Sequence, residues 1–145
     1  MKSTILRSTL AALACAGALA LATPSMAAMI NLKADMKASN EVPPNDSKGS
    51  GSLTATYDEA SKKLTWKGST KDLSGPATAA HFHGPAESGK NAGVAVPITG
   101  AEKDSFEGSA TLTDAQAADM MGGKWYVNVH TAANKAGELR GQLTK

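Results

Sequence analysis

The stretch that decides the fold is SLTATYDEASKKLTWKG, residues 52–68. In its first half, Leu53, Ala55 and Tyr57 alternate with threonines. After a polar turn, Leu64 begins a second alternation that includes a tryptophan and a glycine. A period of two sends successive side chains to opposite faces of a strand. The stretch therefore predicts two antiparallel strands joined by a short turn, with one apolar and one polar face.

The same alternation continues on both sides of this hairpin. Upstream, residues 30–36 alternate between apolar and polar side chains, and a loop rich in Gly, Pro, Asn and Ser follows over 40–50. Downstream, alternation and bounding turn residues predict further strands at 77–83, 94–98, 106–110, 125–130 and 139–143. Because Pro97 has no backbone N–H to donate, we expect the strand at 94–98 to lie at a sheet edge or a bulge.

One short helix is predicted near 113–121. Thr113 followed by Gln116 has the spacing of a capping box. The alanines and methionines between Asp114 and Met121 favour helix, and Gly122-Gly123 terminates it. About eight short strands with one helix indicate an all-β domain, built as a Greek-key sandwich or barrel.

The N-terminus has the pattern of a cleavable secretory signal peptide. Lys2 and Arg7 precede an uncharged, Ala- and Leu-rich stretch over 8–23, and small residues follow it. The stretch is shorter than the roughly 20 apolar residues of a membrane-spanning helix. We predict cleavage after Ala27, with Ala28 as a near-equal choice, and a periplasmic or secreted protein.

Cleavage there removes residues 1–27 and leaves one β-domain, residues 28–145, without a transmembrane segment. The single cysteine, Cys15, is removed with the signal; a lipid-attached cysteine is the less favoured alternative, because alanine stands three residues before it instead of leucine. The mature chain then forms neither a disulfide nor a thiolate metal site. It keeps 13 basic and 13 acidic residues, and this neutrality argues against nucleic acid or anionic lipid as the main partner.

The three histidines of the chain are candidate metal ligands. His81 and His83 lie two apart on a predicted strand, so their side chains leave the same face. His130, near the end of another predicted strand, is able to supply a third nitrogen, with water or a carboxylate as the fourth ligand. Neutral imidazole suits copper and zinc, so we expect Cu(II) first and Zn(II) second. Histidines that face solvent or serve only the structure are the alternative.

Other candidate sites are weaker. Met29, Met36, Met120 and Met121 are potential Cu(I) ligands, but their positions fit the apolar sides of a strand and a helix better. The chain lacks a Gly-x-Ser-x-Gly nucleophile motif and a phosphate-binding loop. We therefore expect no enzyme activity. Three histidines cannot hold both metals of a copper–zinc superoxide dismutase, and a mononuclear copper redox activity is a minor alternative.

Four motifs resemble the CHRD domain, a module first described in chordin and also found alone in exported bacterial proteins. The resemblance extends over about residues 29–143. Its motifs are NEVPP at 40–44, AHFHGPA at 80–86, WYVNVHT at 125–131 and GELRGQ at 137–142. The resemblance implies an extracellular or periplasmic β-domain of immunoglobulin-like architecture.

The motifs contain polar residues that fit a shared site. They are His81, His83, His130, Asn128, Glu138 and Arg140. We expect the histidines to be ligands and the other three residues to support them, or else all six to form a structural hydrogen-bond network. The competing hypothesis is a metal-independent adhesion or interaction module that binds an envelope or extracellular protein through the loops at 40–50 and 87–93.

Overall fold

The hairpin predicted from residues 52–68 is formed by two long antiparallel strands. In the computed structural model, which describes residues 27–145, these are β2 (Ser50–Asp58) and β3 (Lys63–Lys71). Tyr57 pairs with Leu64, so the two apolar sets lie on one face, as the alternation requires. The first 26 residues, with Cys15 and nearly all of the predicted signal peptide, lie outside the described part of the chain.

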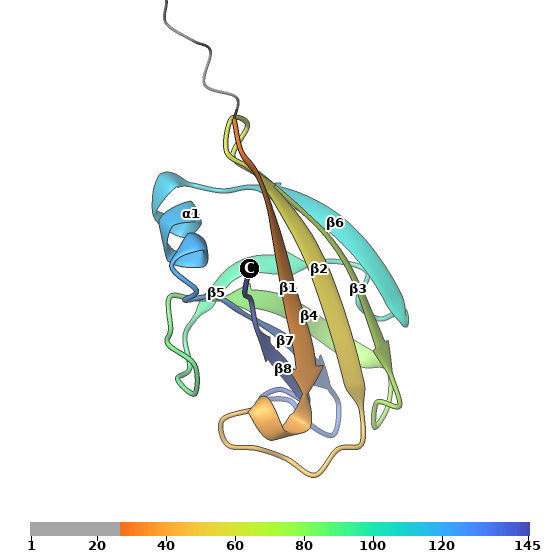
Figure 1. Ribbon diagram of the computed structural model, residues 1–145. Helices are drawn as coiled ribbons and strands as arrows, with labels where there is room; N and C mark the ends of the chain where they lie inside the picture. The colour runs from red at the N-terminus through yellow and green to blue at the C-terminus, as the bar shows by residue number, and fades with distance from the viewer. Residues whose placement is uncertain (1–26) are drawn as a thin grey trace, which may run out of the picture.

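The hairpin belongs to one antiparallel sheet of eight strands (Figure 1). The other elements are β1 (Met29–Lys37), the short 3-10 helix η1 (Ala38–Asn40), β4 (Ala77–His83), β5 (Val94–Ile98), β6 (Ser105–Thr111), β7 (Tyr126–Thr131) and β8 (Leu139–Gln142). The strand order is β5-β4-β7-β8-β1-β2-β3-β6. Cα atoms of the two outermost strands, β5 and β6, come within 8 Å of each other, so the curved sheet is a nearly closed barrel.

The all-β prediction, with about eight strands and one short helix, is confirmed. Of the two predicted forms, the single continuous sheet makes the fold a barrel. Pro97 lies on β5, which is an edge strand, as expected for a residue without a backbone donor. Among residues 27–145, no helix has both the length and the hydrophobicity to cross a lipid bilayer.

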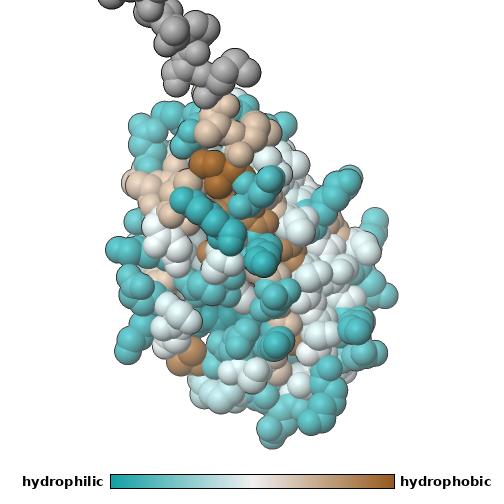
Figure 2. All heavy atoms as spheres, viewed as in Figure 1, coloured by the Kyte–Doolittle hydropathy of each residue, from teal (hydrophilic) through white to brown (hydrophobic). Residues whose placement is uncertain are grey.

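The barrel interior is filled by the apolar half of each alternating strand. Leu64 is fully buried and Trp66 is 3% exposed. The Trp66 ring packs edge-on against Phe82 of β4, with 5.1 Å between the centroids, and so joins the β1–β3 side of the barrel to the β4–β7 side. The polar residues of the strands face outward. Figure 2 shows a largely hydrophilic face, with a hydrophobic patch below the grey residues.

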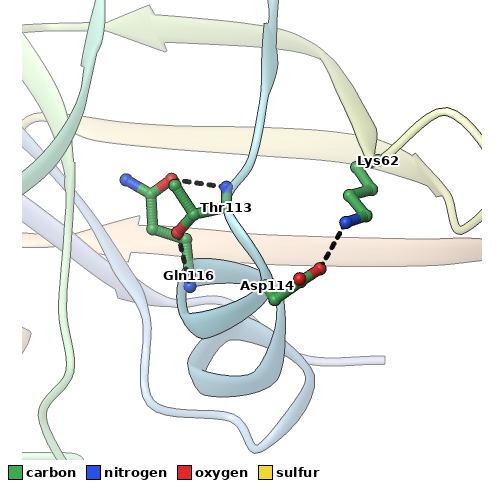
Figure 3. A network of polar contacts seen from close by, with 4 residues as sticks. All are labelled: Lys62, Thr113, Asp114 and Gln116. Carbon is green, nitrogen blue, oxygen red and sulfur yellow. Dashed lines mark hydrogen bonds and ion pairs between the residues drawn. The ribbon is translucent and has the colours of Figure 1, made fainter.

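The helix α1 (Asp114–Met121) begins with the predicted capping box (Figure 3). Thr113 Oγ1 accepts a hydrogen bond from Gln116 N at 3.2 Å, and Gln116 Oε1 accepts one from Thr113 N at 3.0 Å. Lys62 forms an ion pair with Asp114 at 2.5 Å, but both side chains are largely exposed, so the pair adds little stability. The cap therefore contributes more than the ion pair to fixing the start of α1.

We expect Thr113→Ala to lower the free energy of unfolding by about 1 kcal/mol, because the Gln116 N–H loses its partner. Urea denaturation followed by circular dichroism measures this change. Thr99→Ala, in an exposed turn, is the matched control and should change stability by less than about 0.5 kcal/mol. Equal effects of the two substitutions would contradict the importance of the cap.

Candidate metal centre

The three histidines meet on the outer face of the barrel, where β4 and β7 pair. His81 and His83 of β4 alternate with Phe82, whose side chain is fully buried in the barrel, so the two imidazoles point outward. On β7, Asn128 lies opposite His81, and His130 is two residues farther along the same face. The sheet thus brings together two histidines from one motif and one from another.

One ring nitrogen from each histidine lies within 4.8 Å of the other two. His81 Nδ1 and His130 Nε2 are 3.2 Å apart. A tetrahedral ion with bonds of about 2.0–2.1 Å requires nitrogens roughly 3.3 Å apart. The hydrogen-bonded His81–His130 pair already has this spacing, and one His83 nitrogen lies within 4.8 Å of both.

Backbone carbonyls fix which nitrogen of two of the rings carries the hydrogen. His83 Nδ1 lies 3.0 Å from the carbonyl oxygen of Ala92, and His130 Nδ1 lies 2.9 Å from that of Lys135. A carbonyl oxygen only accepts, so each Nδ1 carries the hydrogen and each Nε2 keeps a lone pair. Metal-bound histidines in proteins have this arrangement. His83 Nε2 is buried and has no hydrogen-bond partner among the described residues, which fits a ligand atom.

The electrostatics favour the neutral form of His81 and His83. Burial lowers the pKa of His81 below its usual 6.5, and the neighbouring His130 and His83 lower it further. Burial also lowers the pKa of His83, although the hydrogen bond to Ala92 partly opposes this shift. Both rings are therefore neutral at pH 7, as a metal ligand must be.

Arg140 contacts Tyr126, which in turn stacks on His83; Tyr126 was not among the site residues predicted from the sequence. The guanidinium carbon of Arg140 lies 3.6 Å from the centroid of the Tyr126 ring. The same ring stacks on His83, with centroids 4.9 Å apart and planes 4° apart. Tyr126 belongs to the WYVNVHT motif, so its place in that motif was the available signal.

Asn128 supports a buried carboxyl group beside the cluster. Its amide donates hydrogen bonds to Glu41 Oε1 and, at 3.3 Å, to the carbonyl oxygen of Leu139. Burial raises the pKa of Glu41 to about 7, although the charge of Arg140 acts in the opposite direction. Glu41, which lies in the NEVPP motif, was likewise not among the site residues predicted from the sequence.

The contact between Glu41 and Asn128 also explains a glycine of the GELRGQ motif. Gly137 has φ of 143°, and a Cβ atom at this position would collide with the side chains of Asn128 and Glu41. A larger residue would therefore separate the two side chains or strain the backbone.

Glu138 lies apart from the histidines. Its carboxylate accepts hydrogen bonds from Ser47 Oγ (2.6 Å), Ser74 N (2.8 Å), Ser74 Oγ (2.5 Å), Thr131 Oγ1 (2.5 Å) and Asn134 Nδ2 (3.2 Å). Burial alone would raise the pKa of Glu138, but these hydrogen bonds outweigh it and lower the pKa to about 2. The residue joins three loops and does not contact the candidate ligands.

The methionines are also separate from the cluster. Met36 is fully buried and Met120 is 1% exposed, both within the hydrophobic core of the barrel. Met121 packs against this core, and Met29 is 63% exposed at the start of β1. For Met36 and Met120 the structural interpretation holds, because the sheet separates the core from the outward-facing histidines.

We expect Glu138→Gln to lower the free energy of unfolding at pH 7 by about 2–3 kcal/mol, because buried donors lose their charged acceptor. The pKa of Glu138 is lower in the folded than in the unfolded chain, so its stabilisation is present above about pH 4.5 and is lost toward pH 2. Urea denaturation at pH 7, 5 and 3 should therefore show that the free energy of unfolding falls less on acidification in the variant than in the unmodified protein.

The exposed Glu107, which pairs only loosely with Lys67 at 3.7 Å, provides the control. Glu107→Gln should leave both the stability at neutral pH and its acid dependence close to those of the unmodified protein. If Glu138→Gln behaves in the same way, Glu138 does not stabilise the loops as described.

Comparison with known proteins bears directly on these motifs. No curated protein and no solved structure matches the chain. The family model of the CHRD domain matches residues 32–143, a range that contains all three histidines, Glu41, Tyr126 and Arg140. The match extends over nearly all of the described residues, and the chain belongs to the CHRD domain family.

Proposed function

We propose that this CHRD-domain protein is exported to the periplasm or secreted, and there binds Cu(II), or as second choice Zn(II), through His81, His83 and His130. Its role is to sequester or deliver the ion, without catalytic turnover. The observation that carries the proposal is the convergence of three imidazole nitrogens within 4.8 Å, two of the rings being oriented by backbone carbonyls.

The donor set supports this choice of ion. Among the described residues, the only group of metal-ligating side chains that converges consists of the three imidazoles, without a carboxylate or thiolate. Neutral imidazoles suit Cu(II) and Zn(II), whereas calcium and magnesium require several oxygen ligands. His81 and His130 are half-buried, so a water molecule can complete the coordination and the ion can exchange.

We expect the exported protein to bind one Cu(II) or Zn(II) per chain with a Kd below about 10 µM, equivalent to roughly 7 kcal/mol of binding free energy. His83→Ala should weaken binding at least tenfold, because one of three ligands is lost. Isothermal titration calorimetry measures both quantities.

Thr78→Ala, an exposed position on the same strand, is the matched control and should leave the affinity unchanged. A Kd above about 10 µM, or an affinity that His83→Ala leaves intact, would rule out metal binding at this site. Either result would favour the metal-independent interaction module instead.

The pH dependence provides an independent test. Because the pKa values of His81 and His83 lie below 6.5, protons should compete with the ion only in more acidic solution. We expect the affinity for Zn(II) to be nearly constant from pH 8 to about 6.5 and to fall below about pH 6. Competition with a chromogenic chelator between pH 5 and 8 measures it, and a flat profile would contradict histidine ligation.

A further inference from the structure

We infer that Arg140 and Tyr126 are positioning residues: they hold the loop 84–93 so that the Ala92 carbonyl keeps the lone pair of His83 on Nε2. The structural part of this inference concerns the protein without an ion, and its consequence for affinity rests on the proposed metal-binding function. The three side chains come from adjacent strands, His83 from β4, Tyr126 from β7 and Arg140 from β8, so that Tyr126 lies between the other two.

Arg140 of β8 donates two hydrogen bonds to the loop 84–93. Its Nη2 donates to the carbonyl oxygen of Lys90 at 2.5 Å, and its Nη1 donates to Asn91 Oδ1 at 2.9 Å. Arg140 is only 2% exposed, and none of the ion pairs formed within residues 27–145 includes it. The buried guanidinium is therefore stabilised by these two loop acceptors, by the face of the Tyr126 ring and by attraction to the Glu41 carboxyl group, and losing the loop contacts would be costly.

Tyr126 forms hydrogen bonds with the same loop at Ala92. Its hydroxyl donates to the carbonyl oxygen of Ala92 at 3.3 Å and accepts from the Ala92 N–H at 3.1 Å. The Ala92 carbonyl is the group that also accepts from His83 Nδ1. One tyrosine thus holds both backbone groups of the residue that sets the hydrogen position of His83.

Asn91 also connects the loop to the NEVPP segment. Asn91, which accepts from Arg140, donates its own amide hydrogen to the carbonyl oxygen of Val42 at 2.9 Å. The loop 84–93 is therefore held against both β8 and the NEVPP segment. With the loop in place, moving the His83 hydrogen to Nε2 would break the bond to Ala92, and turning the ring over would disturb its stack on Tyr126.

Two substitutions test the inference. Arg140→Lys keeps the charge, but a lysine ammonium lacks the planar fork that serves both acceptors and lies flat on the ring. Tyr126→Phe keeps the ring, and with it the contacts to His83 and Arg140, and removes only the hydroxyl that holds Ala92. If Arg140→Lys prevents folding, Tyr126→Phe alone decides the outcome.

The first measurement is the tautomer of His83 by nitrogen-15 NMR, in the full exported protein after treatment with a chelator. We expect only the Nδ1–H form in the unmodified protein, and a substantial Nε2–H population in both variants. The second measurement is the affinity for Zn(II), which should fall roughly 10- to 100-fold in the variants, as for other residues that orient metal ligands.

Glu138→Gln is the matched control, because it also removes a buried charge two residues from Arg140 but makes no contact with the loop 84–93. It should leave the His83 tautomer unchanged, although it destabilises the fold; for the Zn(II) affinity, the exposed Thr78→Ala is the control. An unchanged tautomer in Arg140→Lys and Tyr126→Phe would overturn the inference.

The two proposals fail in different ways. If the unmodified protein shows the Nδ1–H form and the variants lose it, but no protein binds Zn(II), the positioning role stands and the metal-binding function fails. If the unmodified protein binds Zn(II) and the variants keep both the tautomer and the affinity, the function stands and the positioning role is overturned.

Discussion

The pairing of β4 with β7 is the interaction on which the rest of the site depends. Every second residue of these strands fills the barrel, so the residues between them must stand on the outside in register. This register places His81 opposite Asn128 and His83 opposite Tyr126. A shift by one residue would turn the histidines into the core and Phe82 to the solvent. Core packing therefore also positions the candidate ligands.

Around this pair, the barrel buries the carboxyl groups of Glu41 and Glu138 and the guanidinium of Arg140, and each is stabilised in a different way. Glu138 stays charged because hydroxyl, amide and backbone donors surround its carboxylate. The Arg140 guanidinium lies on the Tyr126 ring and donates to two loop acceptors. Glu41 accepts a hydrogen bond from Asn128, but burial raises its pKa to about 7. All three residues lie in the NEVPP and GELRGQ motifs, within the range that the CHRD family model matches, so these motifs contain buried polar groups as well as the neighbours of the histidines.

Much of the architecture could be predicted because it follows from local rules. The alternation around Leu64 and Trp66 predicted the central hairpin, and Thr113 with Gln116 predicted the start of the helix. The i, i+2 spacing of His81 and His83 predicted a common face. By contrast, Asn128, Glu138 and Arg140 were grouped as supporting residues. Only Arg140, through Tyr126, reaches a histidine, while Asn128 supports Glu41 and Glu138 joins loops elsewhere.

By itself, the sequence determined the strands, the helix cap, the polar outer face and the three candidate ligands, because these depend on neighbours in the chain. Only the tertiary structure decided that β8 lies between β7 and β1, and that Arg140 therefore stands beside Tyr126. It likewise decided that the loop 84–93 folds back so that Ala92 orients His83. Such contacts join residues far apart in the chain, and their geometry depends on how the whole sheet curves and on which loops pack over it.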